Sequence, residues 1–312
     1  MALDAETVTF LSRLAEEGAR PFHTMSPREA RDMLGTLSAR IGDGPTMARS
    51  FDANVGTDAN RTFRVRALIP NDHPRGVIVY FHGGGWVVGS IDDFDCLGRT
   101  LASQSGCSVV LVDYRLAPEH PYPCAVEDAW SALNWTVEHL DELGSTNPKN
   151  PKIVVAGDSA GGNLAAVVTQ RACRMGTPSV ALQVLVYPVT DCDLDTPSYT
   201  QAENQLLLSR DAMAWFWSHY APDPASRRDP QVSPLRAADL RGLPPTVIVT
   251  AEHDVLRDEG EAYAQHLSKA GVTVDHIHFD GQMHGFFSLV NILSSSANAI
   301  EYVALKIRTS LA

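Results

Sequence analysis

Short apolar runs recur along the chain, and stretches with helical periodicity separate them. Six of these runs predict strands, at 76–81, 108–113, 152–157, 180–187, 246–251 and 273–279. Between the runs, apolar residues recur at helical spacing, most clearly in the stretch 126–140. The segment 61–68 instead alternates basic and apolar residues, as a half-exposed antiparallel strand does. This alternation of strands and helices predicts an α/β fold with a mostly parallel sheet.

Two segments do not follow this alternation. Residues 1–45 precede the predicted strands and contain two amphipathic helices, and the second begins at a capping box formed by Ser26 and Glu29. The stretch at about 190–230 is helical and aromatic. We therefore divide the chain into an N-terminal helical segment, 1–45, and an α/β domain, 46–312, with an insertion at about 190–230.

A G-x-S-x-G motif lies between the predicted strand at 152–157 and the helix that follows it. The motif reads Gly157-Asp158-Ser159-Ala160-Gly161. The chain must turn sharply here with Ser159 at the apex, which is the context of a nucleophile elbow. A Cβ atom at Gly157 or Gly161 would crowd the neighbouring backbone. The N-terminus of the following helix offers N–H donors and the positive end of its dipole to a developing anion.

A glycine-rich loop follows the predicted strand at 76–81. The loop reads His82-Gly83-Gly84-Gly85-Trp86. Consecutive glycines let backbone N–H groups approach a substrate closely, and such donors stabilise the oxyanion that forms during acyl transfer. By itself, the loop is also compatible with a flexible glycine turn. Because it accompanies the elbow, we assign Gly83 and Gly84 as two oxyanion donors and the N–H of Ala160 as the third.

An acidic residue is expected after the serine and before the histidine. Asp254 follows the predicted strand at 246–251, and functional loops of parallel sheets lie at the carboxyl ends of strands. Its competitors are Glu252, Asp258 and Glu259. Asp258 and Glu259 fall in the first turn of the next helix, where the helix dipole alone favours acidic residues.

The predicted base is His284, which lies between two glycines on the loop after the strand at 273–279. His276 and His278 alternate within that strand, and we assign them solvated or structural roles. His82 is assigned to hydrogen bonding within the glycine-rich loop.

Together these motifs resemble the hormone-sensitive-lipase-like esterases, the bacterial family IV branch of the α/β-hydrolases, in the subgroup with a GDSAGG elbow. The resemblance extends from about residue 63 to about residue 287 and includes the block DYRLAPEHPYP at 113–123. It implies an α/β-hydrolase fold with a mostly parallel central sheet of about eight strands flanked by helices. It also implies a helical cap formed by residues 1–45 and the insertion at about 190–230.

The resemblance further implies a role for each reacting residue. Ser159 is the nucleophile, His284 the base and Asp254 the acid that orients it. The chain departs from the common family pattern at Val255, where many relatives have proline, and at Cys124, where alanine is frequent. We expect chemistry through an acyl-enzyme, with no cofactor and no metal ion.

Bulky side chains beside the catalytic loops are predicted to touch the substrate. They are Trp86, Val88, Leu208, Trp215, Phe286 and Phe287. Leu208 and Trp215 have an alternative role in packing the cap. A closed apolar pocket predicts short- to medium-chain acyl esters, because a longer chain must displace packed side chains.

Composition and charge narrow the class of protein. A chain of 312 residues can bury a full core without disulfides or metals. Its net charge of -12 argues against nucleic acids and anionic membranes as partners. The five cysteines have no metal-ligand spacing, the N-terminus has no signal-peptide pattern, and no stretch is apolar enough to span a bilayer. A cytoplasmic protein is therefore expected.

The sequence predicts a serine carboxylesterase whose partner is a small-molecule ester. An amidase or deacetylase would use the same residues and stays open as an alternative. A non-catalytic small-ligand receptor of this fold is disfavoured, because Ser159, Asp254 and His284 are all present. The last predicted strand, 273–279, contains no lysine or proline and is expected to pair with its own copy in a homodimer, unless the C-terminal helix covers it.

Overall fold

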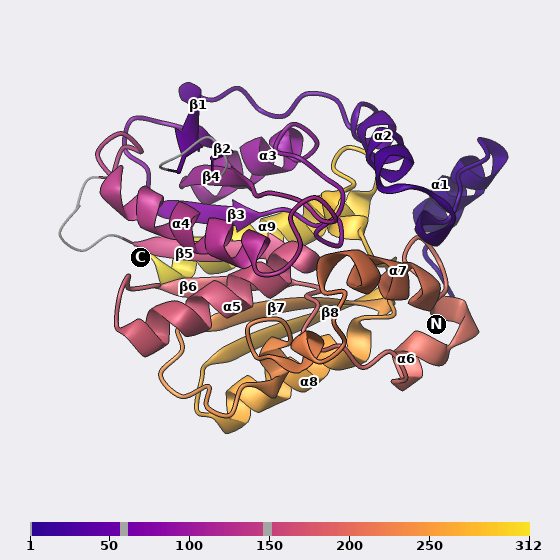
Figure 1. The fold of residues 1–312 in the computed structure, drawn as a ribbon. Coiled ribbons are helices and arrows are strands. Elements are labelled where there is room, and N and C mark those ends of the chain that lie inside the picture. The colour runs from indigo at the N-terminus through magenta and orange to yellow at the C-terminus, as the bar shows by residue number, and fades with distance from the viewer. Residues whose placement is uncertain (1, 57–61, 146–151) are drawn as a thin grey trace.

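The computed structural model describes residues 2–56, 62–145 and 152–312. Its centre is an eight-stranded sheet in the order β1-β2-β4-β3-β5-β6-β7-β8 (Figure 1). β2 pairs antiparallel with β1 and β4, and the other neighbouring strands are parallel. The strands are Arg49–Val55 (β1), Phe63–Ile69 (β2), Val77–Phe81 (β3), Ser108–Asp113 (β4), Ile153–Asp158 (β5), Leu182–Val186 (β6), Thr246–His253 (β7) and Val274–Met283 (β8).

Helices cover both faces of the sheet. The α-helices are Ala5–Glu16 (α1), Pro27–Ser38 (α2), Asp95–Ser105 (α3), Cys124–Glu138 (α4), Ala160–Met175 (α5), Pro197–Thr200 (α6), Arg210–Tyr220 (α7), Arg257–Lys269 (α8) and Ser294–Ser310 (α9). Short 3-10 helices are Phe22–Thr24 (η1), Ala202–Asn204 (η2), Ser226–Arg228 (η3), Pro234–Arg236 (η4) and Phe286–Ser288 (η5). The core with α4, α5 and α8 lies on one face, and the core with α3 and α9 lies on the other.

Strand β3 shows why the apolar runs are nearly continuous. Val77, Val79 and Phe81 belong to the core under α4 and α5. Ile78 and Tyr80 belong to the core under α3 and α9. A strand that is buried on both faces needs apolar residues at every position, so the predicted α/β fold with a mostly parallel sheet is confirmed.

The antiparallel end of the sheet differs from the prediction. β1 was not predicted, because its sequence RSFDANV is largely exposed and carries charged and small polar residues. The predicted antiparallel strand at 61–68 corresponds to β2, and residue 61 lies outside the described residues. At the opposite edge, β8 continues to Met283 rather than ending at Phe279.

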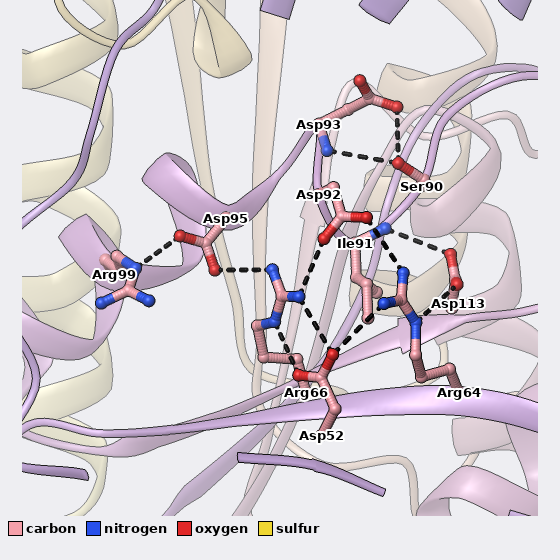
Figure 2. Close-up of polar contacts among 10 residues, drawn as sticks. All are labelled: Asp52, Arg64, Arg66, Ser90, Ile91, Asp92, Asp93, Asp95, Arg99 and Asp113. Atoms are coloured by element: carbon pink, nitrogen blue, oxygen red, sulfur yellow. Dashed lines mark hydrogen bonds and ion pairs between the residues drawn. The ribbon is translucent and has the colours of Figure 1, made fainter. Parts of the chain in front are cut away.

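Charged side chains fasten a long loop to β1 and β2. Arg64 and Arg66 on β2 both pair with Asp52 on β1 and with Asp92 on the loop between β3 and α3 (Figure 2). Arg66 also pairs with Asp95, at the start of α3. The network therefore anchors the C-terminal part of the connection between β3 and α3. This connection begins with the glycine-rich loop.

Helices α1, α2, α6 and α7 gather at one end of the molecule (Figure 1). α2 begins at the predicted capping box, in which Glu29 N–H donates to Ser26 Oγ and Ser26 N–H donates to the Glu29 carboxylate. Phe22 and Phe216 join η1 to α7, with ring centroids 5.3 Å apart. This is the place where the cap is expected, and the division into 1–45 and 46–312 stays a prediction.

Candidate active site

Ser159 lies at the sharp turn between β5 and α5. Its φ of 56° and ψ of -120° form a backbone conformation that L-residues rarely adopt. Its N–H donates to Val186 O at 2.8 Å, so β6 supports the turn. A Cβ atom at Gly157 or Gly161 would overlap the backbone of Phe81. The predicted need for glycine at both positions is confirmed, because only glycine lets these segments approach so closely.

Three side chains form a chain of hydrogen bonds at the carboxyl ends of β5, β7 and β8. Ser159 Oγ lies 3.0 Å from His284 Nε2, and His284 Nδ1 lies 2.8 Å from Asp254 Oδ2. Asp254 is fully buried, and its second oxygen accepts the Leu256 N–H at 2.9 Å. When His284 Nδ1–H donates to Asp254, Nε2 is free to accept the serine proton. This arrangement can activate a serine for attack on a carbonyl carbon.

The competing carboxylates are engaged elsewhere. Glu252, Asp258 and Glu259 each accept a backbone N–H at 2.6–2.7 Å, from Gly281, Ser198 and Thr190 in that order. Burial raises the pKa of Glu259 well above its usual range. Of the four carboxylates considered from the sequence, the structure places Asp254 against His284.

Gly83, the first glycine of the glycine-rich loop, is not free to act as the oxyanion donor that the sequence predicts. Gly83 N–H donates to Asp158 Oδ1 at 3.0 Å. Because a backbone N–H carries a single hydrogen, this bond speaks against Gly83 as an oxyanion donor and corrects that assignment. In the described part of the chain, the N–H groups of Gly84, Gly85 and Ala160 have no hydrogen-bond partner.

The second and third glycines form a tight turn. Gly84 has φ of 111° and Gly85 has φ of 57°, which favour glycine. A Cβ atom at Gly84 would overlap the backbone of Val88, and one at Gly85 would overlap the ring of Phe216. The turn therefore lies directly under a side chain of α7.

His82 belongs to the support of this loop. Its ring lies between Phe94 and Tyr114, with ring centroids 5.2 and 4.4 Å away, and its Nδ1 lies 2.7 Å from Gly83 O. Burial lowers the pKa of His82 and so favours the neutral imidazole. The prediction that His82 takes part in the hydrogen bonding of the loop is confirmed.

Asp158 is a buried carboxyl group next to Ser159 in the elbow. It accepts the Tyr80 O–H at 2.8 Å in addition to the Gly83 N–H. Burial raises the pKa of Asp158 to about 6, and these two hydrogen bonds oppose the shift. The carboxyl group therefore titrates close to neutral pH.

Comparison with known proteins identifies the family of this chain. A family model described as alpha/beta hydrolase fold matches residues 78–288. The chain belongs to this α/β-hydrolase family. The predicted resemblance to the family of hormone-sensitive-lipase-like esterases is confirmed. Membership of the GDSAGG subgroup stays a prediction.

Similar proteins match 80% or more of the chain. The carboxylesterase NlhH of Mycobacterium tuberculosis is 44% identical over 80% of this chain and 79% of its own length. An ethyl acetate hydrolase of Pseudomonas putida is 35% identical over 97% of this chain and 98% of its own. The crystal structure of a hyperthermophilic esterase from Pyrobaculum calidifontis is 38% identical, covers 100% of both chains and superposes with a TM-score of 0.92.

Most side chains predicted to touch the substrate lie in packed cores of this α/β-hydrolase. Trp86, Val88, Phe286 and Phe287 are at most 1% exposed. Trp86 stacks on Tyr220, with ring centroids 4.1 Å apart, and so packs against α7. Phe286 packs against Tyr187 and Phe279. Leu208 is buried, and Trp215 packs on Phe216 and His219. Contact of these six residues with a substrate stays a prediction.

The structure brings three other side chains to the catalytic loops. The Tyr187 ring lies 4.5 Å from the His284 ring, Phe216 lies against Gly85, and Leu207 lies against Gly285. Tyr187 follows β6 directly, and the rule that sites lie at the carboxyl ends of parallel strands could have identified it. Leu207 and Phe216 carry no such signal, because their direction depends on how the cap folds.

The described residues contain no cluster of three or more His, Cys, Asp or Glu side chains that could hold a metal ion. Within the same ranges, no helix combines the length and the apolar composition that crossing a bilayer requires.

Proposed function

We propose that this α/β-hydrolase is a serine carboxylesterase that acts on short- to medium-chain acyl esters. The hydrogen-bonded chain from Ser159 through His284 to Asp254 carries the proposal. The names of the relatives support it, because two of them are a carboxylesterase and an ethyl acetate hydrolase.

The reaction has two acyl-transfer steps. Ser159 Oγ attacks the ester carbonyl carbon while His284 Nε2 takes its proton, and the resulting imidazolium gives that proton to the departing alcohol. The acyl group is then bonded to Ser159. Water attacks this acyl-enzyme with His284 again as base, and the carboxylic acid leaves as the serine regains its proton. Asp254 fixes the imidazole tautomer and stabilises the imidazolium in both steps.

We assign the oxyanion donors to Gly84, Gly85 and Ala160, in place of the predicted set that included Gly83. The N–H groups of all three residues have no partner among the residues that the structure describes, which supports this assignment. Ala160 is also the first residue of α5, where the helix dipole favours negative charge. One such donor is worth about 3 kcal/mol to the transition state.

A cavity lies beside the proposed site, between α1, η1 and α2. The cavity has a volume of about 420 Å³ and has Leu14, Phe22, Met25, Met33, Leu37 and Leu207 among its lining residues. Leu207 also lies against Gly285, next to His284, and Phe22 packs on Phe216 above Gly85. Glu17, Arg20, Glu29, Asp32 and Arg40 also line the cavity, and of its lining residues Leu207 is the one that lies against a catalytic loop.

Pre-steady-state hydrolysis of p-nitrophenyl butyrate tests the proposal. The wild-type protein is expected to release p-nitrophenol in a burst that is stoichiometric with enzyme, because acylation of Ser159 by this activated ester is faster than deacylation and the acyl-enzyme accumulates. Ser159→Ala should lower turnover by about a millionfold and keep the circular dichroism of the wild type. Turnover of butyranilide at a comparable rate would favour an amidase. Binding of either compound without turnover would favour a receptor.

We also propose an oligomeric state and a cellular location for this protein. A homodimer through β8 is supported by its position, since within the described sheet β8 is the last strand and pairs with β7 alone. A monomeric mass by light scattering at micromolar concentration would contradict it. A cytoplasmic location is supported by the five cysteines, which are all free.

A further inference from the structure

Arg31 of α2 links the cap to the loops behind the proposed oxyanion site. Its Nε donates to Val87 O at 2.8 Å, and its Nη2 donates to Ala117 O at 2.9 Å. The same guanidinium binds both carboxylate oxygens of Glu119, at 2.9 and 2.7 Å. These contacts use the planar fork of an arginine, which the single ammonium of a lysine cannot reproduce.

The first carbonyl belongs to the turn that holds the proposed donors. Val87 N–H and Val88 N–H both donate to Gly84 O, at 3.0 and 2.9 Å. The turn that contains Gly84 therefore ends at the residue whose carbonyl Arg31 binds. A shift of Val87 would move the peptides that carry the proposed oxyanion donors.

The second carbonyl belongs to the neighbouring loop, which is bonded to the same turn. Ala117 N–H donates to Trp86 O at 2.8 Å. The guanidinium of Arg31 thus lies where the two loops meet and binds one carbonyl from each. Arg31 therefore connects the two loops to each other, rather than contacting only one of them.

The ion pair between Arg31 and Glu119 does not by itself explain the position of the guanidinium. The side chains of Arg31 and Glu119 are 30% and 54% exposed, and ion pairs this exposed add little to stability. Arg31 holds the pKa of Glu119 at about 2, so the carboxylate keeps the guanidinium oriented across the neutral pH range. The pair is therefore suited to aim the Nε and Nη2 donors at the two carbonyls.

The remainder of the connection between the glycine turn and α3 is held by other contacts. Ile91 N–H donates to Asp113 Oδ1 at 3.2 Å, and Arg64 and Arg66 bind Asp92 (Figure 2). That network joins the C-terminal part of this connection to the sheet. Arg31 instead approaches the glycine turn from the cap.

We propose that Arg31 is a positioning residue for the oxyanion hole, which makes the docked position of α2 a condition for full turnover. By binding Val87 O and Ala117 O, it holds the N–H groups of Gly84 and Gly85 in the geometry that the tetrahedral intermediate requires. This inference rests on the proposed esterase function.

Full-length Arg31→Lys and Arg31→Met variants test the inference, with Arg171→Met as the matched control. Arg171 pairs with Glu127, is similarly exposed at 24%, and lies on α5 away from the glycine turn. We expect kcat for p-nitrophenyl butyrate to fall about tenfold or more in both Arg31 variants, with KM changed by less than about threefold. The rate of inactivation by a p-nitrophenyl alkylphosphonate should fall in parallel, because phosphonylation develops the same oxyanion.

The acid limb of the pH profile should stay in place in the Arg31 variants, since the triad is untouched. If Arg31→Met does not fold, the kcat values of Arg31→Lys and Glu119→Gln test the inference in its place. Wild-type kcat in the folded Arg31 variants would overturn the inference, and so would an equal loss of kcat in Arg171→Met. A wild-type protein that lacks Ser159-dependent hydrolysis would instead overturn the proposed function.

Discussion

The carboxyl group of Asp158 accepts the N–H of Gly83 at 3.0 Å and so joins the nucleophile elbow to the glycine-rich loop. Asp158 is the residue before Ser159, and Gly83 is the residue before the turn with the proposed donors. This hydrogen bond therefore adds to the pairing of β3 with β5 in holding the elbow beside the glycine-rich loop. The bond also removes Gly83 from the set of oxyanion donors.

The titration of Asp158 predicts an unusual pH dependence of stability. Burial raises its pKa to about 6 in the folded protein, above its ordinary value of 3.8. Between these values the folded state keeps a proton that the unfolded chain releases, so this group lowers the free energy of unfolding as pH rises. The melting temperature of the wild type minus that of Asp158→Asn should therefore be largest below its ordinary pKa of 3.8 and decline until about pH 6. A difference that grows with pH in thermal melts would contradict the sign.

The identity of the orienting acid predicts a large kinetic effect at one position. Asp254→Asn should lower kcat by about four orders of magnitude, as a wrong imidazole tautomer does in a related triad. Asp258→Asn is the control, because the Asp258 carboxylate binds Ser198 N–H and Arg257 rather than His284. If Asp258→Asn is the crippling change in steady-state assays, the assignment of Asp254 is wrong.

The packed side chains beside the catalytic loops predict a dependence on acyl length. Each added methylene contributes about 0.8 kcal/mol while the acyl pocket still has room. Beyond that length, the chain must displace packed side chains such as Phe22 and Leu207. A series of p-nitrophenyl esters should show kcat/KM rising over the first few carbons and falling for long chains. Rapid hydrolysis of emulsified long-chain triglycerides, with a jump in rate at the interface, would contradict a small pocket.

The sequence was sufficient to bring together the three residues of the proposed triad, because each one follows a strand of the sheet. Ser159, Asp254 and His284 lie directly after β5, β7 and β8, and the parallel sheet brings these strand ends together. The register of the oxyanion donors was not predictable in the same way. Three consecutive glycines look alike in sequence, and only the bond from Gly83 to Asp158 distinguishes the first from the others.

Side-chain direction limited the prediction of the pocket. Trp86 follows the glycine-rich loop in sequence, yet its ring packs against Tyr220 of α7. Leu207, rather than its neighbour Leu208, contacts Gly285. A positive φ of 59° at Trp86 contributes to this direction, and sequence periodicity does not report such a value. The missed strand β1 has a related cause, since its exposed residues lack an apolar pattern.

Covalent labelling of the nucleophile tests the central claim most directly. The wild-type protein is treated with a p-nitrophenyl alkylphosphonate, and the mass of the intact chain and of its peptides is measured. We predict one phosphonyl group per chain, located on Ser159, with loss of esterase activity in proportion to labelling. His284→Ala should label far more slowly, because the serine then lacks its base. Labelling at another serine, or full activity after Ser159 is modified, would contradict the account.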